Sequence, residues 1–440
     1  KAVDYLIKSS KKSLRKYALE ESHQYFKRSL NLLTEKTDLT EADKELLIDI
    51  LIKWAYVYYY QGDFKGLVEL FRQNEQIAKS LNDKTKRGFF LAWLGMASWI
   101  RENLKESERY LREALELGQA DEDQRLIGYA CCWLSMTGFD VGLFGEGLEL
   151  AERGVEIAKL LESDHYLYFK SLHARGFAYH YMGYCKENLQ IGKALLDYGN
   201  KHSNPRCLVL GHMSISFAHS VAGNPTLALE ASKEAVKASA DPVYSIIPNS
   251  IAALSYFQMG EFKEAEKIAR ATLAFSEKYG CEFHGTVASI ILDVVMIDNG
   301  KMAIGLKRIE DLLQQLRKAE KKSFSSTGEH ILGKIYFQIA SGEGPLRLST
   351  LLKNAVFLAK TLPIASKRAE YHFNKAIDLA KEIGAKGVEG QAYFDLGMLY
   401  KTKKKKDLAK QYISKAVQVF EETNAEVYLE QARQALESLS

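Results

Sequence analysis

Two short stretches decide the fold: residues 58–64, YYYQGDF, and residues 256–262, YFQMGEF. Each places a glycine, and then an aromatic residue, directly after an apolar run. The same slot recurs at spacings of 37 to 41 residues, at Gly62, Glu102, Gly142, Gly183, Gly223, Gly260, Gly300 and Ala340. A regular series of this length indicates an internal repeat with a period near 40 residues.

The residues around each slot predict a pair of antiparallel helices. A small residue often lies seven positions before the slot, as at Ala55 and Gly95, and an aromatic residue four positions before it, as at Tyr58 and Tyr179. Apolar residues recur at i, i+3, i+4 and i+7, which is the helical period. The small residue lets the second helix approach closely. Glycine at the slot supplies the left-handed backbone that ends a helix.

We therefore predict an all-α protein, a right-handed superhelix (α-solenoid) of about ten helix pairs with no β-sheet. The units are expected near residues 1–40, 41–82, 83–122, 123–163, 164–203, 204–240, 241–280 and 281–322, with the first helix of the next unit at 323–341. An inserted helical segment, 342–365, follows, with one extra helix expected over 348–360. We interpret it either as a helix packed on the solenoid or as a mobile lid. Residues 366–440 hold the C-terminal units and a capping helix.

Composition excludes disordered, collagen-like and mucin-like proteins. The chain is 47% apolar and 26% charged, as globular proteins are. Its 60 basic and 56 acidic residues give a net charge of +4, too balanced to predict a nucleic-acid partner. No apolar run approaches the ~20 residues of a membrane span. Only 6 prolines occur, against roughly 22 at average usage. We expect five of them at helix starts or in connections: Pro205, Pro242, Pro248, Pro345 and Pro363. We expect the sixth, Pro225, in an inter-helix turn.

Motifs that carry chemistry are absent from the sequence. It contains no GxxxxGK[ST] loop, HExxH, GxSxG, GxGxxG or EF-hand loop. We predict no catalysis by this segment and no cofactor. His173 and His180, like His212 and His219, are seven residues apart, but nothing completes a set of metal ligands, so no metal is predicted. Five scattered cysteines without a CxxC pair favour a reducing, cytoplasmic location.

The first helices of a superhelix build its concave face, and this face is the candidate binding site. One interpretation is a groove for an amphipathic helix or extended peptide, because aromatic anchors and adaptable methionines suit that task. The other is that tight curvature buries much of the face as core. The repeat register projects these residues inward: Tyr56, Tyr59, Met96, Trp99, Met136, Phe139, Asp140, His173, Phe177, His180, Met213, Phe217, Leu254 and Phe257.

The repeat resembles the tetratricopeptide repeat over nearly the whole chain. The best copy is Tyr393, Leu396, Gly397, Tyr400, Ala409, Ile413 and Ala416, which follows the family spacing. The family period is about 34 residues, so these units carry longer helices. Longer-armed repeats of this kind resemble the sensor regions of bacterial signalling proteins. The resemblance implies a protein or peptide partner.

A second resemblance concerns the two ends of the chain. Residues 2–8, AVDYLIK, and 17–22, YALEES, look like the junction between a bacterial AAA-type ATPase module and its repeats. Residues 380–386, AKEIGAK, 395–400, DLGMLY, and 428–432, YLEQA, resemble the C-terminal region of multidomain class III adenylate/guanylate cyclases. The chain also begins with Lys1 rather than Met, so we expect a segment of a longer protein.

The resemblance implies a regulatory module of such a cyclase, whose groove binds a partner, a peptide or another part of its own chain. One alternative is the ligand-sensing region of an ATPase-type transcription regulator. Another is a free-standing scaffold or co-chaperone, which would line its groove with lysine and asparagine, whereas the projected strip is apolar.

Overall fold

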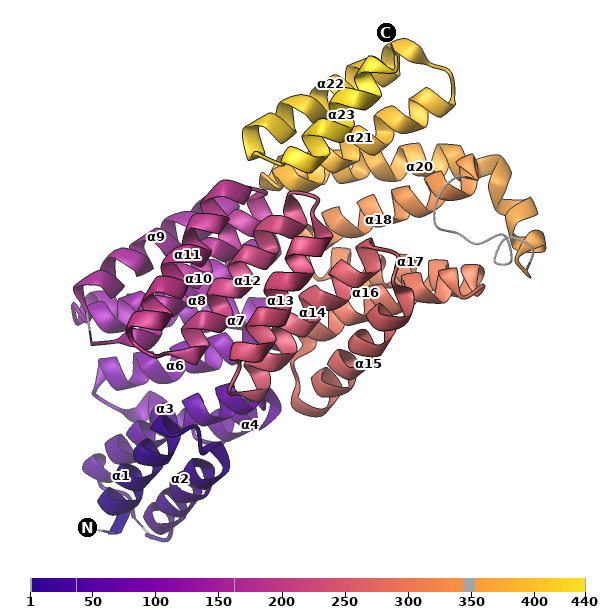
Figure 1. The fold of residues 1–440 in the computed structure, drawn as a ribbon. Coiled ribbons are helices and arrows are strands. Elements are labelled where there is room, and N and C mark those ends of the chain that lie inside the picture. The colour runs from indigo at the N-terminus through magenta and orange to yellow at the C-terminus, as the bar shows by residue number, and fades with distance from the viewer. Residues whose placement is uncertain (1, 37, 162, 343–352, 440) are drawn as a thin grey trace.

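The protein is a solenoid of helix pairs. The computed structural model describes residues 2–36, 38–161, 163–342 and 353–439, and within these ranges the regular structure is entirely helical, with no strand (Figure 1). The predicted all-α superhelix of about ten helix pairs is confirmed. The pairs are α1 (Ala2–Arg15) with α2 (Leu19–Thr34), α3 (Glu41–Gln61) with α4 (Phe64–Gln73) and α5 (Glu75–Ser80), α6 (Lys84–Ile100) with α7 (Leu104–Ala120), α8 (Gln124–Val141) with α9 (Phe144–Leu160), α10 (His165–Met182) with α11 (Cys185–Lys201), α12 (Pro205–Val221) with α13 (Pro225–Ala238), α14 (Pro242–Gln258) with α15 (Phe262–Tyr279), α16 (Glu282–Asp298) with α17 (Met302–Lys318), α18 (Lys322–Ser341) with α20 (Ala355–Ile383), and α21 (Lys386–Thr402) with α22 (Lys406–Thr423), followed by α23 (Glu426–Glu437).

Local sequence sets where these helices begin and end. The Asp63 carboxylate accepts a hydrogen bond from the Gly66 amide at 2.9 Å, which caps the start of α4, and Asp83 caps α6 in the same way. At the repeat slots the backbone turns left-handed, with φ of 79° at Gly62 and 87° at Gly183. The prediction that glycine ends the first helices is therefore confirmed at these slots.

Small residues on the first helices permit close packing, as predicted. A Cβ added at Gly95 of α6 would lie 2.6 Å from the Leu111 side chain of α7. A Cβ at Gly333 of α18 would lie 2.5 Å from the Phe373 ring of α20. This second contact shows that α20 supplies the delayed second helix of the interrupted unit.

The interrupted unit differs from the expectation in two details. Helix α18 runs past the predicted slot at Ala340 and ends at Gly342, whose φ is 67°. Helix α20 is continuous from Ala355 to Ile383, so the predicted boundary after residue 365 lies within it. The extra helix expected over 348–360 and the inserted segment 342–365 fall partly on residues 343–352, which lie outside the described residues.

Two prolines lie inside helices and not at the predicted starts or connections. Pro248 is within α14 and Pro363 within α20. A proline in a helix interior removes one backbone hydrogen bond. Each of these helices packs on both of its neighbours, α13 and α15 for α14, and α18 and α21 for α20, and this packing outweighs the lost bond. Pro345 lies outside the described residues.

The superhelix closes on itself after five units. Helix α3 contacts α14, α8 contacts α18, and α10 contacts α21, and each pair is five units apart in the sequence. Polar contacts cross the same seam: the Thr286 hydroxyl donates to Glu102 at 3.0 Å, and Arg101 pairs with Glu282 at 3.1 Å. The inner faces of the first helices therefore meet one another and do not line an open channel. Among the described helices, none is long and apolar enough to cross a membrane.

Candidate functional site

A cavity lies where the closing superhelix brings first helices together. Its volume is about 240 Å³, and side chains from α3, α6, α8, α10 and α12 line it together with side chains from α14, α16 and α18. Tyr59, Trp133 and Met213 are almost fully buried, whereas Phe324 is half-buried and Thr327 is exposed. The cavity thus has a deep end and an accessible end.

Nine of the residues predicted to face inward line this cavity: Tyr59, Trp99, Met136, His173, Phe177, His180, Met213, Phe217 and Leu254. The other five lie elsewhere. Met96 and Phe139 are fully buried in the core. The Tyr56 hydroxyl lies 2.6 Å from that of Tyr129, Phe257 packs on Phe262 with ring centroids 5.8 Å apart, and the Asp140 carboxylate accepts from the Trp99 indole N–H at 2.6 Å.

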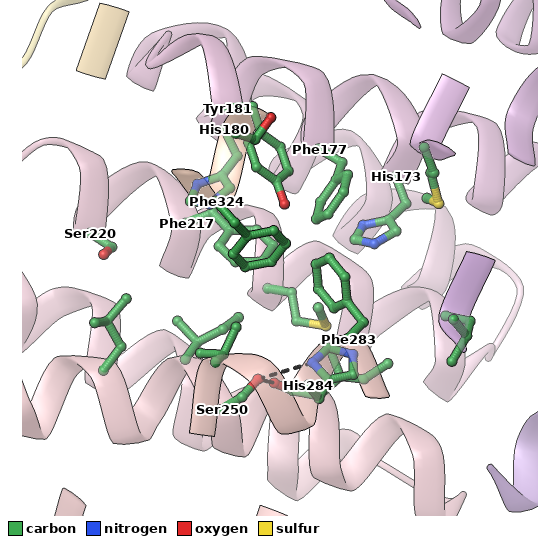
Figure 2. Close-up of a pocket in the computed structure, with 18 of the residues that line it drawn as sticks. His173, Phe177, His180, Tyr181, Phe217, Ser220, Ser250, Phe283, His284 and Phe324 are labelled. Carbon is green, nitrogen blue, oxygen red and sulfur yellow. Dashed lines mark hydrogen bonds between the residues drawn. The ribbon is translucent and has the colours of Figure 1, made fainter. Parts of the chain in front are cut away.

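Helix α10 presents one continuous stripe to the cavity. Lys170, His173, Phe177 and His180 are three, four and three residues apart, so they share one face of the helix. Figure 2 shows Phe177 pointing toward the rings of Phe217, Phe283 and Phe324, which come from α12, α16 and α18. The Phe177 ring centroid lies 6.3 Å from that of Phe217 and 6.1 Å from that of Phe283. Aromatic rings from four helices therefore meet at this level of the cavity.

Lys170 lies at the deep end, and its side chain is buried. It is 3% exposed, and its ammonium donates to the Tyr59 hydroxyl. The Nζ atom lies 4.8 Å from the centroid of the Tyr59 ring and 5.3 Å from those of Trp133 and Tyr244. Burial lowers the pKa of Lys170 to about 7, because an apolar surrounding disfavours the charged form.

Three histidines add further polar groups to the lining. The Nδ1 atoms of His173 and His180 are buried and have no hydrogen-bond partner in the described part of the chain. His284 Nδ1 lies 3.3 Å from the Ser250 hydroxyl, a contact drawn in Figure 2. Burial lowers the pKa of His180 and of His284 to about 4 and that of His173 well below its usual range. These imidazoles are therefore neutral at physiological pH, and each can donate one hydrogen bond and accept another.

Asp140, although outside the lining, gives a testable pH dependence. Burial raises its pKa from 3.8 to about 7, against the opposing hydrogen bond from Trp99. Between these pH values the folded state holds a proton that the unfolded state has lost, so stability falls as the pH rises through this window. We expect Asp140→Asn to stabilise the protein by about 1–3 kcal/mol at pH 8 and to change little at pH 5. Thermal unfolding at the two pH values checks this, and an equal effect at both would contradict it.

Sequence reasoning missed several lining residues. Phe283, His284 and Phe324 belong to units beyond the last projected one, and they reach the cavity because the superhelix closes after five units. Lys170 lies three residues before His173, on the same helical face. Extending the inward register by one step along α10 would have found it.

No set of metal ligands is present in the described ranges: no group of three or more histidine, cysteine, aspartate or glutamate side chains could hold a metal ion. The five cysteines are free and buried. Burial raises the pKa of the Cys131 thiol to about 11, which keeps it protonated and unreactive.

Comparison with known proteins identifies the fold. No protein-family model matches the chain, and no curated protein sequence matches it. Among solved structures, NprR in complex with its cognate peptide NprX has a TM-score of 0.54 at 10% identity, over 87% of this chain and 100% of that one. A Rap protein complexed with competence and sporulation factor has a TM-score of 0.49 at 15% identity, over 83% and 99%. A tetratricopeptide-sensor STAND ATPase from Pyrococcus horikoshii has 0.43 at 14%, over 82% and 55%.

The likeness to NprR covers almost the whole of both chains, and at this level of identity it shows the fold alone. Together with the ten helix pairs and the glycine-ended first helices, it establishes the architecture. The chain has the fold of a tetratricopeptide-like α-solenoid.

Proposed function

We propose that this chain is a non-catalytic regulatory sensor module that binds a peptide or protein partner through the central cavity. The observation that carries the proposal is the aromatic lining at the centre of the closed superhelix. Phe177, Phe217, Phe283 and Phe324 converge there from four different helices (Figure 2). Such a lining suits the apolar side chains of a partner.

The size of the cavity limits what enters it. Pockets for drug-sized ligands run from about 300 to 1,000 Å³, and this cavity measures about 240 Å³. It therefore accepts one or two side chains of a partner and not a whole peptide. Aromatic pockets that bury a few anchoring side chains supply most of the binding energy in many complexes, so a short anchor suffices.

The fold comparison supports a peptide as the partner. NprR, whose fold this chain shares at a TM-score of 0.54, was solved with its cognate peptide. The buried lining adds an argument from chemistry, since a scaffold or co-chaperone that captures acidic tails would expose lysine and asparagine along a groove, and the cavity wall is mostly apolar.

The signalling context is a narrower proposal. Residues 2–8 resemble the junction between a bacterial AAA-type ATPase module and its repeats, and residues 380–386 resemble the C-terminal region of multidomain cyclases. Together these resemblances support a bacterial, cytoplasmic protein in which this module regulates a cyclase. Another part of the same chain then becomes a candidate partner. A sensor region of an ATPase-type transcription regulator is the second candidate, and it uses the same cavity.

The double variant Phe177→Ala, Phe217→Ala tests the proposed function. Peptides selected from a displayed library of random ten-residue sequences would be titrated against the wild type and the variant. Trp99 and Trp133 line the cavity, so intrinsic fluorescence reports its occupation directly. We expect a loss of affinity of at least about 30-fold, because two anchoring rings are removed.

A matched control separates loss of the site from general destabilisation. Phe257 and Phe262 are half-buried partners in the same solenoid, and neither lines the cavity. Phe257→Ala, Phe262→Ala is expected to keep wild-type affinity. Full binding by the cavity variant, with helical content intact, would place the partner site elsewhere.

A further inference from the structure

The cavity contains a basic group, the amine of Lys170, without a counter-ion. Lys170 carries the one ammonium or guanidinium group among the described residues that line the cavity, and none of them carries a carboxylate. No described carboxylate contributes to the electrostatic environment of Lys170, and the one ionisable group that favours its charged form is the Cys132 thiol. A buried charge without a partner is costly. The deep end of the cavity is therefore chemically incomplete.

We propose that the cavity binds a carboxylate attached to an apolar body, with the Lys170 ammonium as its counter-ion. This inference deepens the proposed function, because it names the charged end of the ligand. The carboxylate could be the C-terminus of a peptide whose last side chain is apolar, or the head of a small aliphatic or aromatic acid. Both present the same chemistry to Lys170.

The order of groups along α10 matches such a ligand. Lys170 lies at the deep end, and His173, one turn away, has a buried Nδ1 atom without a partner. The two groups are close enough for the ammonium to lower the pKa of His173. A carboxylate at this point accepts from the ammonium and from the imidazole N–H. The next residue in the stripe, Phe177, begins the aromatic wall that receives the apolar body.

The groups that surround Lys170 make binding depend on pH. They are Tyr59 on α3, Cys132 and Trp133 on α8, His173 on its own helix and Tyr244 on α14, and none is an anion at neutral pH. With the cavity empty, the pKa of Lys170 is about 7. A bound carboxylate favours the charged ammonium, so binding above pH 7 takes up a proton. Affinity should fall as the pH rises, by up to about tenfold per unit.

The experiment compares acids with their uncharged amides. Octanoate and octanamide form one pair of probes. The peptide acetyl-Gly-Gly-Leu-Phe with a free C-terminus, and the same peptide amidated, form the other. Each probe is titrated at pH 6.5 and pH 8.5 against the wild type, Lys170→Met and Lys193→Met, with the tryptophan fluorescence as readout. Lys193 is exposed on α11, so its variant removes the same charge without touching the cavity.

We expect at least one acid to bind the wild type and Lys193→Met about 10- to 100-fold more tightly than its amide. In Lys170→Met the preference for the acid should vanish. The probe that binds, octanoate or the peptide acid, identifies the source of the carboxylate. Wild-type affinity for the acids in Lys170→Met, or no binding of either acid at about 1 mM, would overturn the inference.

The outcome is separable from that of the proposed function. A library peptide that depends on Phe177 and Phe217 but ignores amidation and Lys170→Met leaves peptide sensing intact and removes the carboxylate site. Octanoate bound through Lys170, without any peptide bound at Phe177, gives the opposite result.

Discussion

Replacement of Gly183 by alanine is expected to destabilise the protein by about 2–5 kcal/mol. Gly183 ends α10 with φ at 87°, and a side chain in that left-handed conformation costs about 1–2 kcal/mol. An added Cβ would also lie 2.5 Å from the backbone nitrogen of Gly387, at the start of α21. Backbone cannot rotate away as a side chain can, so overpacking adds about 1–3 kcal/mol. The substitution therefore tests the seam between units five apart.

Gly260→Ala is the matched control for this substitution. Gly260 also has a left-handed backbone, with φ at 78°, but an added Cβ would meet nothing within 4 Å. Gly260→Ala should therefore destabilise the protein by only about 1–2 kcal/mol. Thermal unfolding measures both variants, and hydrogen exchange at the start of α21 should increase in Gly183→Ala alone. Equal effects of the two alanines would show that α10 and α21 do not pack together in solution.

The second large effect is a gain in stability on replacing Lys170 by methionine. The pKa of Lys170 falls from 10.5 to about 7 on folding, and at about 1.36 kcal/mol per unit this sets a ceiling of about 5 kcal/mol. Allowing for the lost contact with the Tyr59 hydroxyl, we expect a gain of about 2–4 kcal/mol near pH 6.5.

The pH dependence identifies the cause of this gain. Between pH 7 and pH 10.5 the Lys170 side chain keeps a proton in the unfolded state that it has released in the folded state, so the destabilising contribution of Lys170 becomes smaller as the pH rises. The advantage of Lys170→Met should therefore shrink to within about 1 kcal/mol near pH 10. Lys193→Met, at an exposed position, should stay within about 0.5 kcal/mol of the wild type. A constant advantage across this range would mean that packing, and not the buried charge, separates the variants.

Lys170→Met is expected both to stabilise the protein and to abolish acid binding. These two results together would show that the cavity keeps a binding group that lowers the stability of the fold, as binding sites often do. The two measurements are independent, because one needs no ligand. Together they decide whether the buried ammonium at the deep end of the cavity is a binding group or only a poorly solvated one.

Much of the fold follows from local signals. The glycines at the repeat slots and the small residues seven positions before them predicted the helix pairs, because a left-handed turn and a close helix contact each depend on residues near in sequence. Local residues did not predict the helix boundaries where tertiary packing outweighs local preference. Pro248 was expected at a helix start or in a connection, yet it lies inside α14. Packing of α13 and α15 on this helix stabilises its helical backbone.

The sequence placed only the part of the candidate site that comes from the earlier repeat units. The inward register of α10 placed His173, Phe177 and His180 on one helical face, because one face of a helix follows from its period, and all three line the cavity. That they bind a partner stays a prediction. Phe283 and Phe324 were missed, since they come from units far along the chain. Asp140 accepts a hydrogen bond from the Trp99 indole and does not line the cavity. The repeat register alone could not distinguish such a core position from one on the cavity wall.

By itself the sequence determined the helices, their pairing and the single solenoid, because these depend on contacts within a unit or between adjacent units. Only the tertiary structure decided that the superhelix closes after five units, so that the expected groove is instead a cavity with one accessible end and Lys170 at its deep end. The physical reason is that small rotations between successive units add up along the chain. A repeat period of about 40 residues fixes the length of each helix pair but not that rotation.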